Sequence, residues 1–156
     1  YQASVEDYRD VMVTLLAAGL WRWWGWRAGT AMALSSLLAA WWSDWLKAEF
    51  ARPRPAITAH LDWVNNAAYP SGHAMNAALV YLLFILLMPG TAHRGWQAAA
   101  LLLAALTGLS RIMLGVHWTT DVLGGWMLGA GLALLTWALV LATTQLLPVH
   151  AVAAEA

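Results

Sequence analysis

The stretch VLGGWMLGAGLALLTWALVLATTQLL, residues 122–147, decides the fold class of this chain. It contains no charged residue. It is also long enough to cross a bilayer, because the hydrocarbon core is about 30 Å thick and a helix rises about 1.5 Å per residue. The rest of the chain has the same character, since 62% of its 156 residues are hydrophobic and only 10% are charged. An ordinary soluble domain carries about 25% charged residues. The composition therefore predicts an integral membrane protein.

Outward from this stretch, four further apolar segments predict transmembrane helices, for about five spans in all: residues 11–26, 28–46, 67–88 and 96–114. The first is short and is interrupted by Arg22, so a helix lying in the interface is the alternative there. Pro89 and Gly90 should end the third. Small residues that would let helices pack closely recur in the last two segments: Gly108, Gly124, Gly125, Gly129 and Gly131. No repeat or linker divides the chain, so we expect residues 1–156 to form a single all-α domain, a polytopic transmembrane helical bundle.

Charge and cysteine usage exclude several classes of function. The formal net charge is zero, so nothing in the overall balance suggests a nucleic-acid partner. The absence of cysteine excludes disulfides, thiolate zinc sites and a cysteine nucleophile. The sequence begins at Tyr1 and shows no signal-peptide pattern, and we expect its N-terminus to be trimmed.

The charged residues also predict how the bundle is oriented. Five alternating crossings place the polar segment 47–69 and the residues around His117 on the same side. Once the cations on that side are set aside as catalytic, three arginines mark the opposite side as cytoplasmic under the positive-inside rule: Arg22, Arg27 and Arg94. We therefore expect a protein of a bacterial cell membrane whose active site faces the extracytoplasmic side.

Three polar clusters lie at helix ends on that face: residues 47–55 (KAEFARPRP), 69–73 (YPSGH) and 110–121 (SRIMLGVHWTTD). From these clusters we select three cations, two histidines and one carboxylate, which is the balance that an anion requires: Lys47, Arg54, Arg111, His73, His117 and Asp121. An arginine inside an apolar span is costly and needs an anionic partner. Phosphoryl transfer spreads negative charge over three oxygens and needs donors from several directions. Ser71 and Gly72 would add a hydroxyl and backbone N–H groups at a helix N-terminus.

The spacing of His117 and Asp121 places them on one face of a helical turn. The carboxylate could then accept a proton from one imidazole nitrogen and leave the other nucleophilic. His73, which arrives from another helix, is the natural general acid for the leaving oxygen. The alternatives are snorkelling lysine and arginine side chains, an N-cap role for Ser71, and a metal site of two histidines and one carboxylate. Three crowded cations would repel a divalent metal, so we favour a site without metal or cofactor.

These clusters resemble the type 2 phosphatidic acid phosphatase superfamily, whose motifs are KX6RP, PSGH and SRX5HX3D. The matching residues are Lys47, Arg54 and Pro55, then residues 70–73, then Ser110, Arg111, His117 and Asp121. Arg52 and Pro53 do not have the right spacing, so we expect Arg52 to matter little. The resemblance implies a membrane core usually of six spans, and we expect the first of them to be missing here. It also implies metal-independent hydrolysis through a phosphohistidine, with five residues holding the phosphate: Lys47, Arg54, Ser71, Gly72 and Arg111.

The resemblance implies a lipid phosphate or pyrophosphate as substrate, such as phosphatidic acid, phosphatidylglycerol phosphate or a prenyl pyrophosphate. A lipid phosphotransferase, which passes the phosphoryl group to an acceptor lipid, is the alternative. A non-enzymatic lipid-binding protein would be expected to have lost its nucleophile. The motifs bind the phosphate and not the tail, so they leave the lipid and the oligomeric state open. We expect the neighbouring polar residues to serve as loop or capping residues and the remaining histidines to be interfacial: Asp44, Glu49, Asp62, Asn65, Asn66, His60, His93 and His150.

Overall fold

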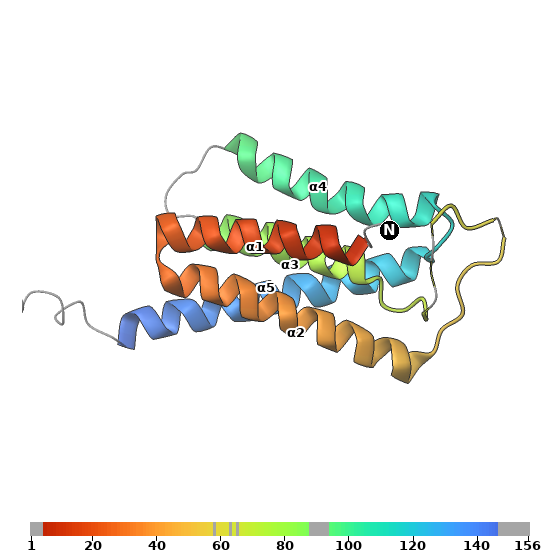
Figure 1. Cartoon of the computed structure of the whole chain (residues 1–156), viewed down its shortest axis with the longest axis horizontal. Helices are drawn as coiled ribbons and strands as arrows, with labels where there is room; N and C mark the ends of the chain where they lie inside the picture. The colour runs from red at the N-terminus through yellow and green to blue at the C-terminus, as the bar shows by residue number, and fades with distance from the viewer. Residues whose placement is uncertain (1–4, 58, 63, 65, 88–93, 147–156) are drawn as a thin grey trace, which may run out of the picture.

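The computed structural model describes residues 5–57, 59–62, 64, 66–87 and 94–146. Within these residues the chain forms five helices and no strand: α1 Val5–Trp24, α2 Trp26–Phe50, α3 Gly72–Leu87, α4 Arg94–Met113 and α5 Thr119–Leu146. Each helix runs antiparallel to the one before it, and together they make an elongated bundle (Figure 1). The predicted all-α bundle is confirmed. Pro89, Gly90, His93, Asn65 and His150 lie outside the described residues.

Two of these helices are long and apolar enough to cross a bilayer by themselves, residues Arg94–Met113 and Thr119–Thr143. Shorter apolar helices cover Val13–Arg22 and Gly72–Leu87. The number of five spans therefore stays a prediction, although all five helices are present. The outward faces carry large exposed hydrophobic side chains, such as Leu37, Leu102 and Leu135, as a surface in contact with lipid tails requires.

Local backbone chemistry sets the ends of the helices. Gly25 separates α1 from α2 with a φ of 90°, a region that favours glycine. The α2 helix ends where Ala51 turns left-handed at φ 42° and donates its N–H to the Lys47 carbonyl at 3.0 Å. Residues 67–71, which the sequence placed in the third span, precede α3 instead. The helix starts at Gly72 because Ser71 caps it, with its Oγ accepting a 3.5 Å hydrogen bond from the Ala74 N–H.

The α3 helix is the centre of the bundle and contacts α2, α4 and α5. Met75, Leu79 and Leu83 on α3 are fully buried in a core shared with the neighbouring helices. Glycines let α5 approach α3 closely, because a Cβ on Gly125 would lie 2.6 Å from the Ser71 carbonyl oxygen. Close packing is thus confirmed for four of the five expected glycines, since only at Gly131 would a Cβ meet nothing within 4 Å.

The polar segments gather at one end of the bundle, as the alternating crossings predicted (Figure 1). The loop 51–71 joins α2 to α3 there, and the turn 114–118 joins α4 to α5. At the opposite end lie the three arginines used to orient the chain: Arg22, Arg27 and Arg94.

Candidate active site

Every motif residue lies at the end of the bundle that holds the loop 51–71. Lys47 belongs to the last turn of α2, and Arg111 to the last turn of α4. Gly72 and His73 open α3, and Asp121 lies in the first turn of α5. Backbone hydrogen bonds fasten the loop 51–71 over this end, with Leu61 N–H donating to the Leu114 carbonyl at 3.1 Å and Ser71 N–H to the Asp121 carbonyl at 3.0 Å. Three stretches far apart in sequence therefore converge, which are the end of α2, the start of α3 and residues 110–121.

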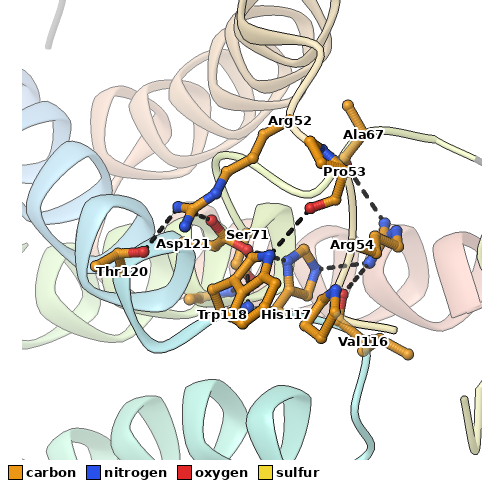
Figure 2. Close-up of polar contacts among 12 residues, drawn as sticks. Arg52, Pro53, Arg54, Ala67, Ser71, Val116, His117, Trp118, Thr120 and Asp121 are labelled. Atoms are coloured by element: carbon orange, nitrogen blue, oxygen red, sulfur yellow. Dashed lines mark hydrogen bonds and ion pairs between the residues drawn. The ribbon is translucent and has the colours of Figure 1, made fainter. Parts of the chain in front are cut away.

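His117 and Asp121 face each other, as their spacing predicted. The distance from His117 Nδ1 to Asp121 Oδ2 is 3.5 Å, and the two side chains are 4% and 0% exposed. The contact is an approach rather than a formed hydrogen bond, because Nδ1 has no hydrogen-bond partner among the described residues. The same carboxylate oxygen accepts the Trp118 N–H at 2.8 Å, which holds it in place (Figure 2).

The contact on the other side of the His117 ring shows which ring nitrogen carries no proton. His117 Nε2 lies 3.3 Å from a terminal nitrogen of Arg54. A guanidinium can only donate, so Nε2 must be an acceptor and the ring proton belongs on Nδ1, toward Asp121. Burial, followed by the positive charges of Arg54 and Lys47, lowers the pKa of His117 from 6.5 to about 3. The imidazole is therefore neutral near pH 7, with its lone pair directed toward Arg54.

Arg54 ties the loop 51–71 to the turn that carries His117. One terminal nitrogen donates to the Val116 carbonyl at 2.6 Å, while Nε and the other terminal nitrogen donate to the Asn66 carbonyl and side chain at 2.8 and 2.7 Å. Burial lowers the pKa of Arg54 below its ordinary value, against the attraction of Asp121 and Asp62. Asn66, expected to be a loop residue, thus orients a motif arginine.

Arg52 lies inside the site, although its motif spacing had set it aside. It donates from one terminal nitrogen to Asp121 Oδ1 and to Thr120 Oγ1, each at 2.7 Å (Figure 2). Its guanidinium also lies 5.7 Å from the centre of the Trp118 ring. The signal in the sequence was the alternation RPRP, because residues two apart in an extended segment point to the same side.

Arg111 has the anionic partner that its position demanded, and this partner is Asp62. The guanidinium donates to Asp62 Oδ2 at 2.8 Å and to Ser110 Oγ at 3.2 Å. Asp62 lies in the loop 51–71, as expected, and its ion pair with Arg111 is a contact that the sequence analysis did not predict. A signal was present in the sequence, since three cations had been set against a single carboxylate. Asp44 forms a weaker ion pair, in which its Oδ1 lies 3.8 Å from Lys47 Nζ. The Asp44 side chain is largely exposed.

Lys47, Gly72 and His73 complete the cluster around His117. A Cβ on Gly72 would lie 3.7 Å from Lys47 Nζ, so the ammonium group faces the start of α3. The charge of His73 is among those that act on the His117 ring. No group of three or more metal-ligating side chains occurs among the residues that the structure describes. The cluster thus combines a neutral imidazole with several fixed cations.

The PAP2 superfamily model matches residues 24–145 of the chain. Phosphatidylglycerophosphatase B of Bacillus subtilis is 36% identical over 107 residues, which cover 65% of this chain and 48% of the relative. An undecaprenyl-diphosphatase of Sulfolobus acidocaldarius is 33% identical over 69 residues, covering 44% of this chain and 32% of the relative. The chain thus spans about half or less of the length of these relatives.

A solved structure has the same fold. The crystal structure of a transmembrane PAP2-type phosphatidylglycerolphosphate phosphatase from Bacillus subtilis superposes with a TM-score of 0.75 at 30% sequence identity. The match covers 92% of this chain and 72% of that one. The likeness supports the assignment of this bundle to the membrane.

Proposed function

This chain belongs to the PAP2 superfamily, and we propose that it is an integral membrane phosphatase that hydrolyses a lipid phosphate or pyrophosphate through a phosphohistidine. The observation that carries the proposal is the His117 ring, which is buried and neutral, with Nδ1 toward Asp121 and Nε2 toward Arg54. Such a ring is a nucleophile prepared for an anionic substrate held by cations.

In the proposed first step, His117 Nε2 attacks phosphorus and the bond from phosphorus to the leaving oxygen breaks. Lys47, Arg54 and Arg111 stabilise the charge on the phosphoryl oxygens, with the Ser71 hydroxyl and the Gly72 N–H as further donors. His73 gives its proton to the leaving oxygen. The Nδ1 proton remains on His117, and the nearby Asp121 carboxylate stabilises the positive charge that develops on the ring.

In the second step water attacks the phosphohistidine and breaks its P–N bond. His73, now neutral, takes a proton from that water and so returns to its starting state. The nitrogen of His117 regains its lone pair, and inorganic phosphate leaves. The Arg54 N–H that faces Nε2 is the donor that an incoming phosphoryl group would meet first. Arg111 would bind the phosphate either in place of Asp62 or together with it.

The membrane setting and the names of the relatives support a lipid phosphate as the substrate. The relatives are named for phosphatidylglycerol phosphate and undecaprenyl diphosphate, both of which carry phosphate on a lipid.

We place this chain in a bacterial cell membrane with its site on the extracytoplasmic side, because Arg22, Arg27 and Arg94 lie at the other end.

Phosphate release in detergent tests this function. The panel contains phosphatidic acid, phosphatidylglycerol phosphate and undecaprenyl diphosphate, each measured with and without an acceptor lipid. Release of inorganic phosphate without acceptor is expected, whereas transfer of the phosphoryl group to the acceptor lipid with little inorganic phosphate released would support the phosphotransferase. Activity should survive EDTA and be inhibited by orthovanadate, since cationic side chains are proposed to do the work of a metal. Loss in EDTA that a divalent ion restores would contradict the metal-independent mechanism.

A further inference from the structure

Ser43 has a buried hydroxyl group whose place in the bundle is not explained by a hydrogen bond within the described residues. The residue lies on α2 and is 4% exposed, and its Oγ has no hydrogen-bond partner in the described part of the chain. Other helical hydroxyls of this bundle donate to the carbonyl one turn back, as Thr107 does to Leu103 at 2.8 Å and Thr143 to Leu139 at 3.0 Å. Leaving a buried hydroxyl unpaired costs free energy, and more so in a membrane protein, so it calls for an explanation.

The position of the Ser43 hydroxyl explains why it is left unpaired. A Cβ on Gly72 would lie 3.2 Å from Ser43 Oγ and 3.7 Å from Lys47 Nζ. Ser43 and Lys47 are one helical turn apart on the same face of α2, so the hydroxyl and the ammonium group both face the first turn of α3. The N–H groups of a first turn favour an anion, and Gly72 leaves the space that a side chain would fill.

Ser36 shows that an unpaired hydroxyl alone does not mark a site. It is two helical turns before Ser43, is buried, and also has no partner for its Oγ among the described residues. It lines a cavity of about 560 Å³ between α1 and α2 whose other lining residues are mostly apolar, among them Ala33 and Leu37. Ser43 differs because a cation and a helix start lie beside it.

We propose that Ser43 is a further phosphate-binding residue. Its hydroxyl donates a hydrogen bond to a phosphoryl oxygen that Lys47 and the start of α3 hold at the same time. This inference rests on the proposed function, because the anion is the phosphoryl group of the substrate. The contact makes and breaks no covalent bond, and it adds a phosphate-binding residue on α2 one turn before Lys47, the first residue of the KX6RP motif.

The test compares Ser43→Ala with Ser36→Ala, since each change removes one buried, unpaired hydroxyl from the same helix. The inhibition constant for orthovanadate and the KM for a lipid phosphate are measured in detergent, together with the thermal midpoint of unfolding. In Ser43→Ala the vanadate constant should rise roughly tenfold or more, as expected for loss of a hydrogen bond to a charged group. In Ser36→Ala it should not change. Neither variant should unfold at a lower temperature than the wild type.

A third variant, Ser43→Cys, separates binding from packing, because a thiol fills the same space and is a weaker donor. It should bind vanadate with an affinity between those of the wild type and Ser43→Ala. The proposal is overturned if Ser43→Ala binds vanadate as Ser36→Ala does, or if weaker binding appears only together with a lower thermal midpoint. A wild type that neither binds vanadate nor releases phosphate would instead overturn the proposed function, so the two failures are distinguishable.

Discussion

At the residue scale, the two histidines should divide the chemistry in a way that the leaving group can reveal. If His73 only protonates the leaving oxygen, nitrophenyl phosphate should bypass it, because nitrophenolate leaves without a proton. The His73→Ala variant should then approach the wild-type burst of nitrophenolate in stopped flow, yet be severely impaired with a lipid phosphate. His117→Ala should give no burst with either substrate. A burst from His117→Ala that vanishes in His73→Ala would mean that the roles are reversed.

Arg52 should matter more than its motif spacing indicated. Its 2.7 Å ion pair with Asp121 neutralises the carboxylate that faces His117, so we expect it to position that carboxylate. In Arg52→Lys an ammonium group on a shorter side chain must replace the terminal nitrogen that donates to both Asp121 and Thr120, and the guanidinium beside the Trp118 ring is lost. The kcat should therefore fall by roughly threefold to tenfold with little change in KM. The control is Arg111→Lys, which removes a proposed phosphate contact and should lower kcat/KM by more than about tenfold. Wild-type kinetics in Arg52→Lys would instead support the expectation, drawn from the motif spacing, that Arg52 matters little.

The lowered pKa of His117 should appear in the stability of the protein. The ring has a pKa of about 3 when folded and 6.5 as its ordinary value, so the unfolded state binds the extra proton. Stability from this group is therefore fully present above about pH 6.5 and is lost as the pH falls toward 3. Between pH 7.5 and pH 5 the thermal midpoint of the wild type in detergent should drop further than that of His117→Ala. Equal drops would contradict a buried, neutral ring.

The sequence predicted which residues gather at one end of the bundle better than it predicted which side chains they contact. Motif spacing identified Lys47, Arg54 and Asp121, because helix ends and one-turn spacings fix where such residues lie. The pairing of Arg111 with Asp62 depends on how the loop 51–71 folds across the bundle, and no periodicity governs that path. A single sequence gives the balance of charges but not the partner of each charge.

At the scale of the helices, the contact between α3 and α5 should depend on Gly129. A Cβ there would collide with the Met75 carbonyl, whereas a Cβ on Gly131 would meet nothing within 4 Å. Gly129→Ala should push the helices apart, lower the thermal midpoint by several degrees and reduce activity, because Ser71 and Asp121 are joined across this contact. Gly131→Ala should be neutral or slightly stabilising, since alanine is the better helix former. Similar midpoints for the two variants would contradict the packing.

Hydropathy predicted these helices well and their ends less well. The apolar segments located all five, since burial in lipid requires long apolar runs. The start of the third was misplaced at residue 67, because Ala67 and Ala68 are apolar although they belong to the loop 51–71. The true start depends on the cap at Ser71, a local hydrogen bond that an average over a window does not register.

At the scale of the whole molecule, the orientation in the membrane can be measured with single cysteines, because the wild type has none. Ile57 lies in the loop 51–71 and is 79% exposed, and a Cβ on Gly95, near the arginine end, would meet nothing within 4 Å. The variants Ile57→Cys and Gly95→Cys are treated with a membrane-impermeant maleimide in spheroplasts, before and after permeabilisation. The wild type serves as the blank, and a cytoplasmic thiol protein reports whether the membrane is sealed.

Under the positive-inside rule, cations near helix ends are retained on the cytoplasmic side, and Arg22, Arg27 and Arg94 all lie at the end away from the site. Ile57→Cys should therefore be labelled in sealed spheroplasts, and Gly95→Cys only after permeabilisation. The reverse pattern would place the site in the cytoplasm. Labelling of both in sealed spheroplasts would contradict a bundle whose two ends lie on opposite sides of the bilayer. An extracytoplasmic site also requires that the phosphate released by the enzyme appear outside sealed spheroplasts, which the same preparation can test with a lipid phosphate.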